Sequence, residues 1–99
     1  MSTQKMYVLV RSDLDPTYRC VQGAHALAKY ALEYPDEFKD WNNSVIVYLG
    51  VRFVSDLKAW ARKLGDKKYS MFLEPDQDMQ PTAIACYDSG FIFRNLLII

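Results

Sequence analysis

MYVLVRSDLDP, residues 6–16, decides the fold because it joins a buried strand to the start of a helix. The apolar run at 6–10 is continuous, which is typical of a strand covered on both faces. Asp15 and Pro16 then supply a helix N-cap and a proline at the first helical position. We expect this helix to extend over 16–33, where a Tyr-Pro pair ends it. A strand that leads directly into a long helix points to an α/β protein.

The rest of the chain continues the alternation of strands and helices. The apolar positions at 57–64 follow the i, i+3, i+4, i+7 spacing of a helix, which we expect Ser55 to cap and Gly65 to end. The expected elements are strands at 6–10, 44–51, 69–74 and 82–87, helices at 16–33 and 55–64, and a short helical turn at 36–41. This β-α-β-α-β-β order predicts a three-layer α/β/α domain with a four-stranded mixed sheet. Its first three strands are expected to be parallel and its last antiparallel.

The composition is that of a globular chain, and 99 residues fit a single domain over 1–99. Hydrophobic residues make up 51% and charged residues 24%, which argues against a disordered chain. Twelve basic and twelve acidic residues cancel, whereas proteins that bind nucleic acid tightly are usually basic overall. We therefore expect any binding of RNA to be weak and strongly dependent on salt.

The cysteines and the histidine bear on metal binding and on the compartment. Cys20 and Cys86 lie far apart and His25 is the only histidine, so the spacing fits no zinc site and no metal or cofactor is expected. Two unpatterned cysteines without a signal peptide favour reduced thiols in the cytoplasm. The longest apolar run is too short to span a bilayer, so no membrane partner is expected.

The last nine residues are unusually apolar for a chain end. They contain seven large apolar side chains: Phe91, Ile92, Phe93, Leu96, Leu97, Ile98 and Ile99. A small domain has limited room to bury all of them on itself, and leaving them in water invites aggregation. We therefore expect this C-terminal tail to pack partly against a second copy, which would give a homodimer.

The helix at 16–33 has two faces when its residues are placed 100° apart. The apolar face is expected to lie on the sheet, and it comprises Cys20, Val21, Ala24, Leu27, Ala28 and Ala31. A second stripe carries Tyr18, Gln22, His25 and Lys29, each three or four residues from the next. His25 falls at the border between the two faces, a position from which a side chain can line a cleft.

Acidic residues follow two of the expected strands. Asp13 lies at the carboxyl end of the first strand, and Glu74 and Asp76 lie at the same end of the third. Ligands of open α/β sheets bind outside the carboxyl ends of parallel strands, and a helix N-terminus there suits an anion or a developing oxyanion. Carboxylates, an amide, an imidazole and backbone N–H groups are therefore expected to converge in one crevice.

Each of these residues also fits a purely structural role. A lone histidine on a helix is often a surface or packed residue, and Asp13 suits an ordinary turn. Glu74 and Asp76 flank a proline that can simply start a turn. A basic cluster is typical of a solvated helix face as well as of an RNA site, and here it comprises Lys58, Arg62, Lys63, Lys67 and Lys68.

Two motifs resemble the archaeal and eukaryotic-type peptidyl-tRNA hydrolases, the second structural class of that activity. In that family a strand ending in Arg-x-Asp-Leu leads into a helix that carries Gln-x-x-His-Ala. Residues 11–14 read Arg-Ser-Asp-Leu and residues 22–26 read Gln-Gly-Ala-His-Ala. The resemblance extends loosely over most of the chain, to the acidic turn Glu-Pro-Asp at 74–76 and the Thr-containing strand at 82–85.

This resemblance implies hydrolysis of the ester between a peptide and tRNA. It implies that Gln22 and His25 are catalytic, together with Glu74 or Asp76, and that Thr82 lies nearby. We add Asp13, Tyr18 and Lys29 as candidate substrate-binding residues, because they lie on the same stripe or at the same strand end.

The sequence departs from the family at two points. A lysine usually opens the family's helix about four residues before the glutamine, and Tyr18 stands there. The family's glycine-containing loop after the third strand is shorter here and reads Glu-Pro-Asp-Gln-Asp at 74–78. The alternative function is therefore a non-catalytic binding or regulatory domain that keeps the fold. A cation from Arg11, Arg19 or Lys29 at the lysine's place would favour the enzyme, and a crevice closed by Tyr18 would favour binding.

Overall fold

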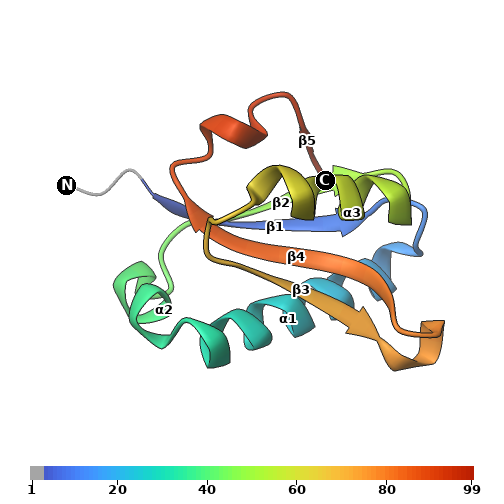
Figure 1. Cartoon of the computed structure of the whole chain (residues 1–99), viewed down its shortest axis with the longest axis horizontal. Helices are drawn as coiled ribbons and strands as arrows, with labels where there is room; N and C mark the ends of the chain where they lie inside the picture. The colour runs from blue at the N-terminus through green and yellow to red at the C-terminus, as the bar shows by residue number, and fades with distance from the viewer. Residues whose placement is uncertain (1–3) are drawn as a thin grey trace.

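The protein is an α/β fold built on one mixed sheet, shown by a computed structural model that describes residues 4–99. In chain order its elements are β1 (Lys5–Arg11), α1 (Pro16–Glu33), α2 (Pro35–Trp41), β2 (Ile46–Val51), α3 (Val54–Leu64), β3 (Tyr69–Glu74), the 3₁₀ turn η1 (Pro75–Gln77), β4 (Gln80–Asp88), the 3₁₀ turn η2 (Phe91–Phe93) and β5 (Leu97–Ile98). The strands are ordered β3-β4-β1-β2-β5 across the sheet. Figure 1 shows this open, twisted sheet between its helices.

The strand directions agree with the sequence, but the number of strands and the element order do not. β1 and β2 pair in parallel, and β4 pairs antiparallel with both β1 and β3. The sheet has five strands rather than four, because the tail returns as β5 and pairs antiparallel with β2. The short helical turn expected at 36–41 is present as a separate helix of seven residues, α2. Two residues are too short for the alternating pattern that identifies a strand, so β5 left no signal in the sequence.

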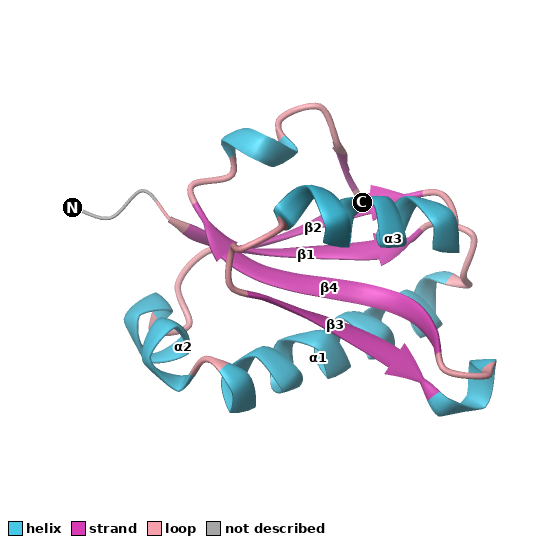
Figure 2. Cartoon of the chain, in the orientation of Figure 1, coloured by secondary structure: helices cyan, strands magenta, loops and turns pink. Residues whose placement is uncertain are grey.

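Helices cover both faces of the sheet, with α1 and α2 on one side and α3 and η2 on the other (Figure 2). Successive residues of β1 point to opposite faces, so Val8 packs under α1 and Leu9 packs under α3. Because β1 is central, its core residues are buried on both faces, as its continuous apolar run predicts. None of the helices in residues 4–99 is long and apolar enough to cross a membrane.

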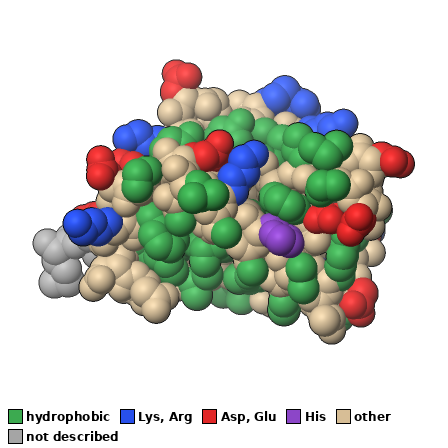
Figure 3. Space-filling model, turned by 90° about the horizontal axis from the view of Figure 1, so that it is seen from below, with side chains coloured by type: hydrophobic (Ala, Val, Ile, Leu, Met, Phe, Trp, Pro, Cys, Tyr) green, Lys and Arg blue, Asp and Glu red, His purple; other side chains and the backbone are tan. Residues whose placement is uncertain are grey.

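The orientation of α1 is the opposite of the one its apolar pattern predicts. Its buried residues are Gln22, Gly23, Ala26 and Tyr30. Cys20, Val21, Ala24 and Ala28 are exposed instead, while Leu27 is partly buried against the core. Seen from below, hydrophobic side chains spread over this side of the molecule, around the histidine (Figure 3).

A close approach between α1 and β2 explains this orientation. The Tyr48 ring lies directly against Gly23, where a Cβ would come within 2.4 Å of the Tyr48 hydroxyl oxygen. Gln22 is buried as well, because it finds a polar partner on β4. The apolar pattern of α1 assumes that a glutamine faces solvent and gives a glycine no preference. It therefore predicts the wrong face of the helix against the sheet.

The start of α3 also differs from the expectation. Ser55 does not cap this helix, which begins at Val54. Phe53 is the N-cap residue, and its backbone N–H donates to a carboxylate oxygen of Asp56 at 2.9 Å. The end of the helix is as expected, because Gly65 follows it with a positive φ of 56°.

The apolar tail is only partly covered by its own domain. Phe93 is buried, and Ile92 and Leu96 pack against the same side of the sheet. Leu97 and Ile98 remain 78% and 77% exposed on β5. The domain therefore buries more of the tail than the sequence suggests, but leaves the edge strand in water.

Candidate functional site

The candidate site lies where β1, β3 and the start of α1 meet. β1 and β3 both lie antiparallel to β4, so their carboxyl ends are on the same edge of the sheet. The candidates that the structure brings to this edge are Asp13, Tyr18, Gln22, Glu74, Asp76 and Thr82. His25 and Lys29 lie farther along α1, beside the middle of β3.

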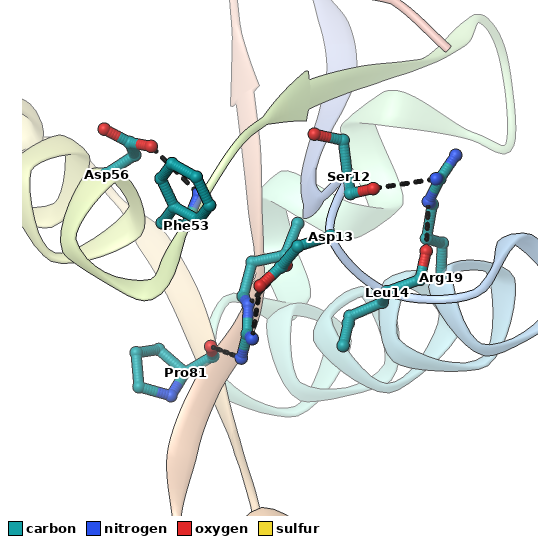
Figure 4. Close-up of polar contacts among 8 residues, drawn as sticks. Ser12, Asp13, Leu14, Arg19, Phe53, Asp56 and Pro81 are labelled. Atoms are coloured by element: carbon teal, nitrogen blue, oxygen red, sulfur yellow. Dashed lines mark hydrogen bonds and ion pairs between the residues drawn. The ribbon is translucent and has the colours of Figure 1, made fainter.

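Asp13 is held by Arg11, which sequence analysis did not include among the site residues. The Arg11 guanidinium donates to both carboxylate oxygens of Asp13, at 3.0 and 2.9 Å. It also donates to the carbonyl of Pro81 at 3.4 Å, so it joins the end of β1 to the start of β4. Figure 4 shows this contact at the carboxyl end of β1. These hydrogen bonds lower the pKa of Asp13 and make this pair an anchor for the loop.

The two cations of α1, Arg19 near this edge and Lys29 farther along the helix, are also engaged by the protein. Arg19 donates to the carbonyls of Leu14 and Ser12 at 2.7 and 2.8 Å, which ties α1 to the preceding turn (Figure 4). Lys29 donates to the carbonyl of Met71 at 2.9 Å. Each of the three cations that could have replaced the family's lysine therefore already donates to an acceptor within the protein.

Gln22 and Thr82 form a buried pair beneath the site. The Thr82 hydroxyl donates to the side-chain oxygen of Gln22 at 2.5 Å, and both residues are at most 1% exposed. The pair connects α1 to β4. Gln22 is therefore below the surface of the site.

Tyr18 and Asp76 are polar residues of the site that are partly exposed and exposed, respectively, and Glu74 at the start of the turn is buried. The Glu74 carboxylate accepts the backbone N–H of Asp76 at 3.4 Å, which shapes the turn η1. The Tyr18 hydroxyl lies beside the Gln77 side chain, and partial burial together with the nearby Glu74 and Asp76 carboxylates raises the pKa of Tyr18. The phenol is therefore protonated at neutral pH and can donate a hydrogen bond. Sequence analysis missed Gln77, because one glutamine in a turn carries no distinctive pattern.

The N-terminus of α1 offers less to an anion than we expected. The Asp15 side chain accepts the N–H of Tyr18 at 3.3 Å, and the Asp15 carbonyl accepts that of Arg19. Pro16 has no N–H to donate. An oxyanion in this site would therefore depend on the Tyr18 hydroxyl more than on backbone donors.

His25 lies apart from the carboxylates and against an aromatic ring. Its imidazole stacks on Phe72 of β3, with ring centroids 4.5 Å apart and planes inclined by 9°. Within residues 4–99 it has no ion pair with either Glu74 or Asp76. The structure therefore places His25 in an exposed aromatic contact beside β3. Phe72 is a further residue of this region that sequence analysis missed.

No three side chains of histidine, cysteine, aspartate or glutamate gather closely enough within the described part of the chain to hold a metal ion. Comparison with known proteins adds no relative: no model of a protein family matches this chain, and neither does any curated protein.

Proposed function

We propose that this protein hydrolyses the ester between a peptide and tRNA. The observation that carries the proposal is the position of Tyr18, which stands where the resembled family has a lysine and lies beside Glu74 and Asp76. A protonated phenol at this point can donate to a developing oxyanion, which is one of the tasks that a lysine ammonium performs.

The exposed carboxylate of Asp76 is the general base in this proposal. It orients a water molecule and takes its proton while the water oxygen attacks the ester carbonyl carbon. The Tyr18 hydroxyl donates to the carbonyl oxygen as negative charge develops there. The bond to the ribose oxygen then breaks, and the proton passes from Asp76 to that oxygen, which releases peptide acid and tRNA.

The other candidates position these two groups or the substrate. Glu74 holds the N–H of Asp76, and the buried Gln22–Thr82 pair fixes α1 against β4 below Tyr18. His25 stacked on Phe72 offers a flat surface to the substrate beyond the site. Asp13 fixes the position of the Arg11 guanidinium. Lys29 ties α1 to β3 by donating to the Met71 carbonyl.

Turnover of peptidyl-tRNA by the wild type and four variants tests the proposal. Tyr18→Phe keeps the ring and removes the donor, so we expect hydrolysis to fall about 10²- to 10³-fold. Asp76→Asn removes the general base, so the rate of hydrolysis should fall about 10²- to 10⁴-fold. Tyr18→Lys restores a cation and should hydrolyse at least as fast as the wild type. Lys39→Gln, on the exposed side of α2, is the matched control and should be unchanged. Equal activity of Tyr18→Phe and wild type would contradict the proposal.

A second candidate is binding of peptidyl-tRNA without hydrolysis. It is favoured by one observation, which is that Arg11, Arg19 and Lys29 all donate to protein acceptors. This function predicts that the wild type and Tyr18→Lys both bind substrate and release no peptide. The same turnover measurements therefore distinguish the two functions.

Two partners belong to this proposal. The first is tRNA, bound weakly and with a steep dependence on salt because the chain has no net charge. The second is another copy of this chain, paired through the exposed edge strand β5 to give a homodimer. A cytoplasmic location fits both partners.

A further inference from the structure

Three exposed or partly exposed aromatic rings each carry a cation, and all three lie between residues 52 and 94. The Arg52 guanidinium lies 5.5 Å from the centre of the Phe53 ring. The Lys63 ammonium lies 4.6 Å from the Trp60 ring, and the Arg94 guanidinium 4.1 Å from the Phe91 ring. Cation–π pairs occur about once per 70–80 residues, so three in this short span exceed what a chain of this size normally contains.

We call these six residues together the aromatic–cation surface, and three of them, Arg52, Trp60 and Lys63, line two neighbouring hollows. Arg52 and Phe53 connect β2 to α3, and Trp60 and Lys63 lie on α3. Phe91 begins η2 and Arg94 follows it, and α3 and η2 lie on the same side of the sheet (Figure 2). The Trp60 ring contacts the buried Phe93 ring of η2 with centroids 5.3 Å apart, which joins α3 to η2. The surface is therefore held by the core and does not depend on a loose loop.

Trp60 separates two hollows on this surface. One, with a volume of about 230 Å³, extends from Gly50 and Arg52 to Leu96. The other, about 220 Å³, is lined by Asp56, Ala59, Trp60 and Lys63. Each hollow has the indole as one wall and one cation beside it, and Asp56 lines both. This arrangement suits flat groups connected by an anionic backbone.

The cations of this surface have no acidic partner. Within residues 4–99, the ion pairs engage Arg11, Lys67 and Lys68 but none of Arg52, Lys63 or Arg94. The carboxylate that does lie here, Asp56, accepts the Phe53 N–H at the start of α3. Local positive charge therefore persists on a chain whose net charge is zero.

We propose that the aromatic–cation surface binds single-stranded RNA. Phe53 and Phe91 are 52% and 70% exposed, so each ring can stack a base while its own cation stays at hand for a phosphate. The hollows beside Trp60 receive further bases. This function requires neither an ester nor the carboxylates of the candidate site, so it goes beyond the proposed hydrolysis.

Fluorescence anisotropy with a fluorescein-labelled decauridylate tests this inference on the full chain. We expect saturable binding at low salt. Phe53→Ala and Phe91→Ala should each weaken it about tenfold, because stacking on an aromatic ring is lost. Lys63→Gln and Arg94→Gln should each make the slope of log binding constant against log salt concentration less steep by about 0.7. Leu32→Ala and Lys39→Gln, both exposed on the other side of the sheet, are the matched controls and should bind as the wild type does.

Several outcomes would overturn the inference. These are absence of saturable binding, equal binding by the ring variants and the wild type, or binding of polyglutamate that equals binding of the oligonucleotide. Preferential binding to vesicles of anionic lipid would also overturn it. Thermal melting of each variant separates loss of binding from loss of fold. Asp76→Asn should keep oligonucleotide binding, so failure of the proposed hydrolysis and failure of this inference give different results.

Discussion

At the scale of single residues, the candidate site rests on polar side chains that also hold the fold together. Gln22 is buried, and a buried amide is costly unless its polar atoms find partners. The Thr82 hydroxyl supplies one such partner, and Arg11 in turn holds Asp13. A change at these positions therefore acts on stability as well as on function, contrary to what the outward stripe of α1 suggested for Gln22.

Gln22→Ala should lower the free energy of unfolding by about 1–3 kcal/mol, because it leaves the Thr82 hydroxyl unpartnered and opens a cavity. Thr82→Val removes the same hydrogen bond, so the double variant should cost less than the sum of the two single ones. Urea unfolding of the four proteins measures this. His25→Ala is the control on the same helix, and its cost should stay near the ~0.5–1.5 kcal/mol of one stacked pair. Additive effects of Gln22→Ala and Thr82→Val would show that the pair does not act as a unit.

The Arg11–Asp13 pair should make stability depend on pH. Arg11 lowers the pKa of Asp13 in the folded state, so the ionised carboxylate favours folding. That contribution is fully present above the ordinary carboxyl pKa of about 3.9 and is lost as pH falls through the lowered folded value. Asp13→Asn should cost about 1–3 kcal/mol at pH 7, since the buried guanidinium loses a charged acceptor. Melting curves from pH 7 to pH 2 should show this difference shrink, and a constant difference would contradict the assignment.

At the scale of elements, the limits of α1 could be predicted but its rotation could not. Asp15, Pro16 and the following Tyr-Pro pair give its limits at Pro16 and Glu33, because caps and prolines act locally. Its buried face depends on Gly23 meeting Tyr48 and on Gln22 meeting a threonine 60 residues away, which no local pattern contains. The sequence could therefore predict that the candidate site lies at the strand ends. It could not predict the long-range contacts that arrange the side chains there.

The contact between Gly23 and Tyr48 gives a test at this scale. In most helices a Gly→Ala change stabilises by up to ~1 kcal/mol, because alanine has the higher helix propensity. Here the new methyl group would overlap the Tyr48 ring, so Gly23→Ala should lower stability by about 1 kcal/mol or more. In a Tyr48→Ala background the overlap is absent, and Gly23→Ala should then stabilise. Urea unfolding of the four proteins would show this reversal of sign, and the same sign in both backgrounds would rule out the contact as the cause.

At the scale of the whole molecule, zero net charge conceals an uneven distribution of charge. Acidic residues gather at α2 and at the turn between β3 and β4, whereas α3 and η2 carry cations beside aromatic rings. Overall composition could exclude strong, uniform binding of nucleic acid, but it could not show that cations and rings meet on one side of the sheet. The sequence could not show the edge strand β5 either, because the tail becomes a strand only by pairing with β2.

The exposed edge at β5 should join two copies of the chain. Within residues 4–99, β5 pairs with Leu49 and Gly50 of β2, and the Ile99 N–H donates to the Tyr48 carbonyl, so the outer edge of β5 and the start of β2 before Tyr48 remain open. Exposed edge strands pair readily with other strands, and Leu97 and Ile98 would add apolar contact in a symmetric, antiparallel arrangement. Sedimentation should therefore give twice the chain mass of 11.5 kDa, and the melting temperature should rise with protein concentration.

The variant carrying both Leu97→Ser and Ile98→Ser should be monomeric, because it keeps its pairing with β2 and loses the apolar contact. Leu32→Ser is the control, since Leu32 is 84% exposed on α1, far from this edge in sequence, and should remain dimeric. A wild-type protein that stays monomeric at high concentration, with a melting temperature independent of concentration, would show that the edge is left unpaired.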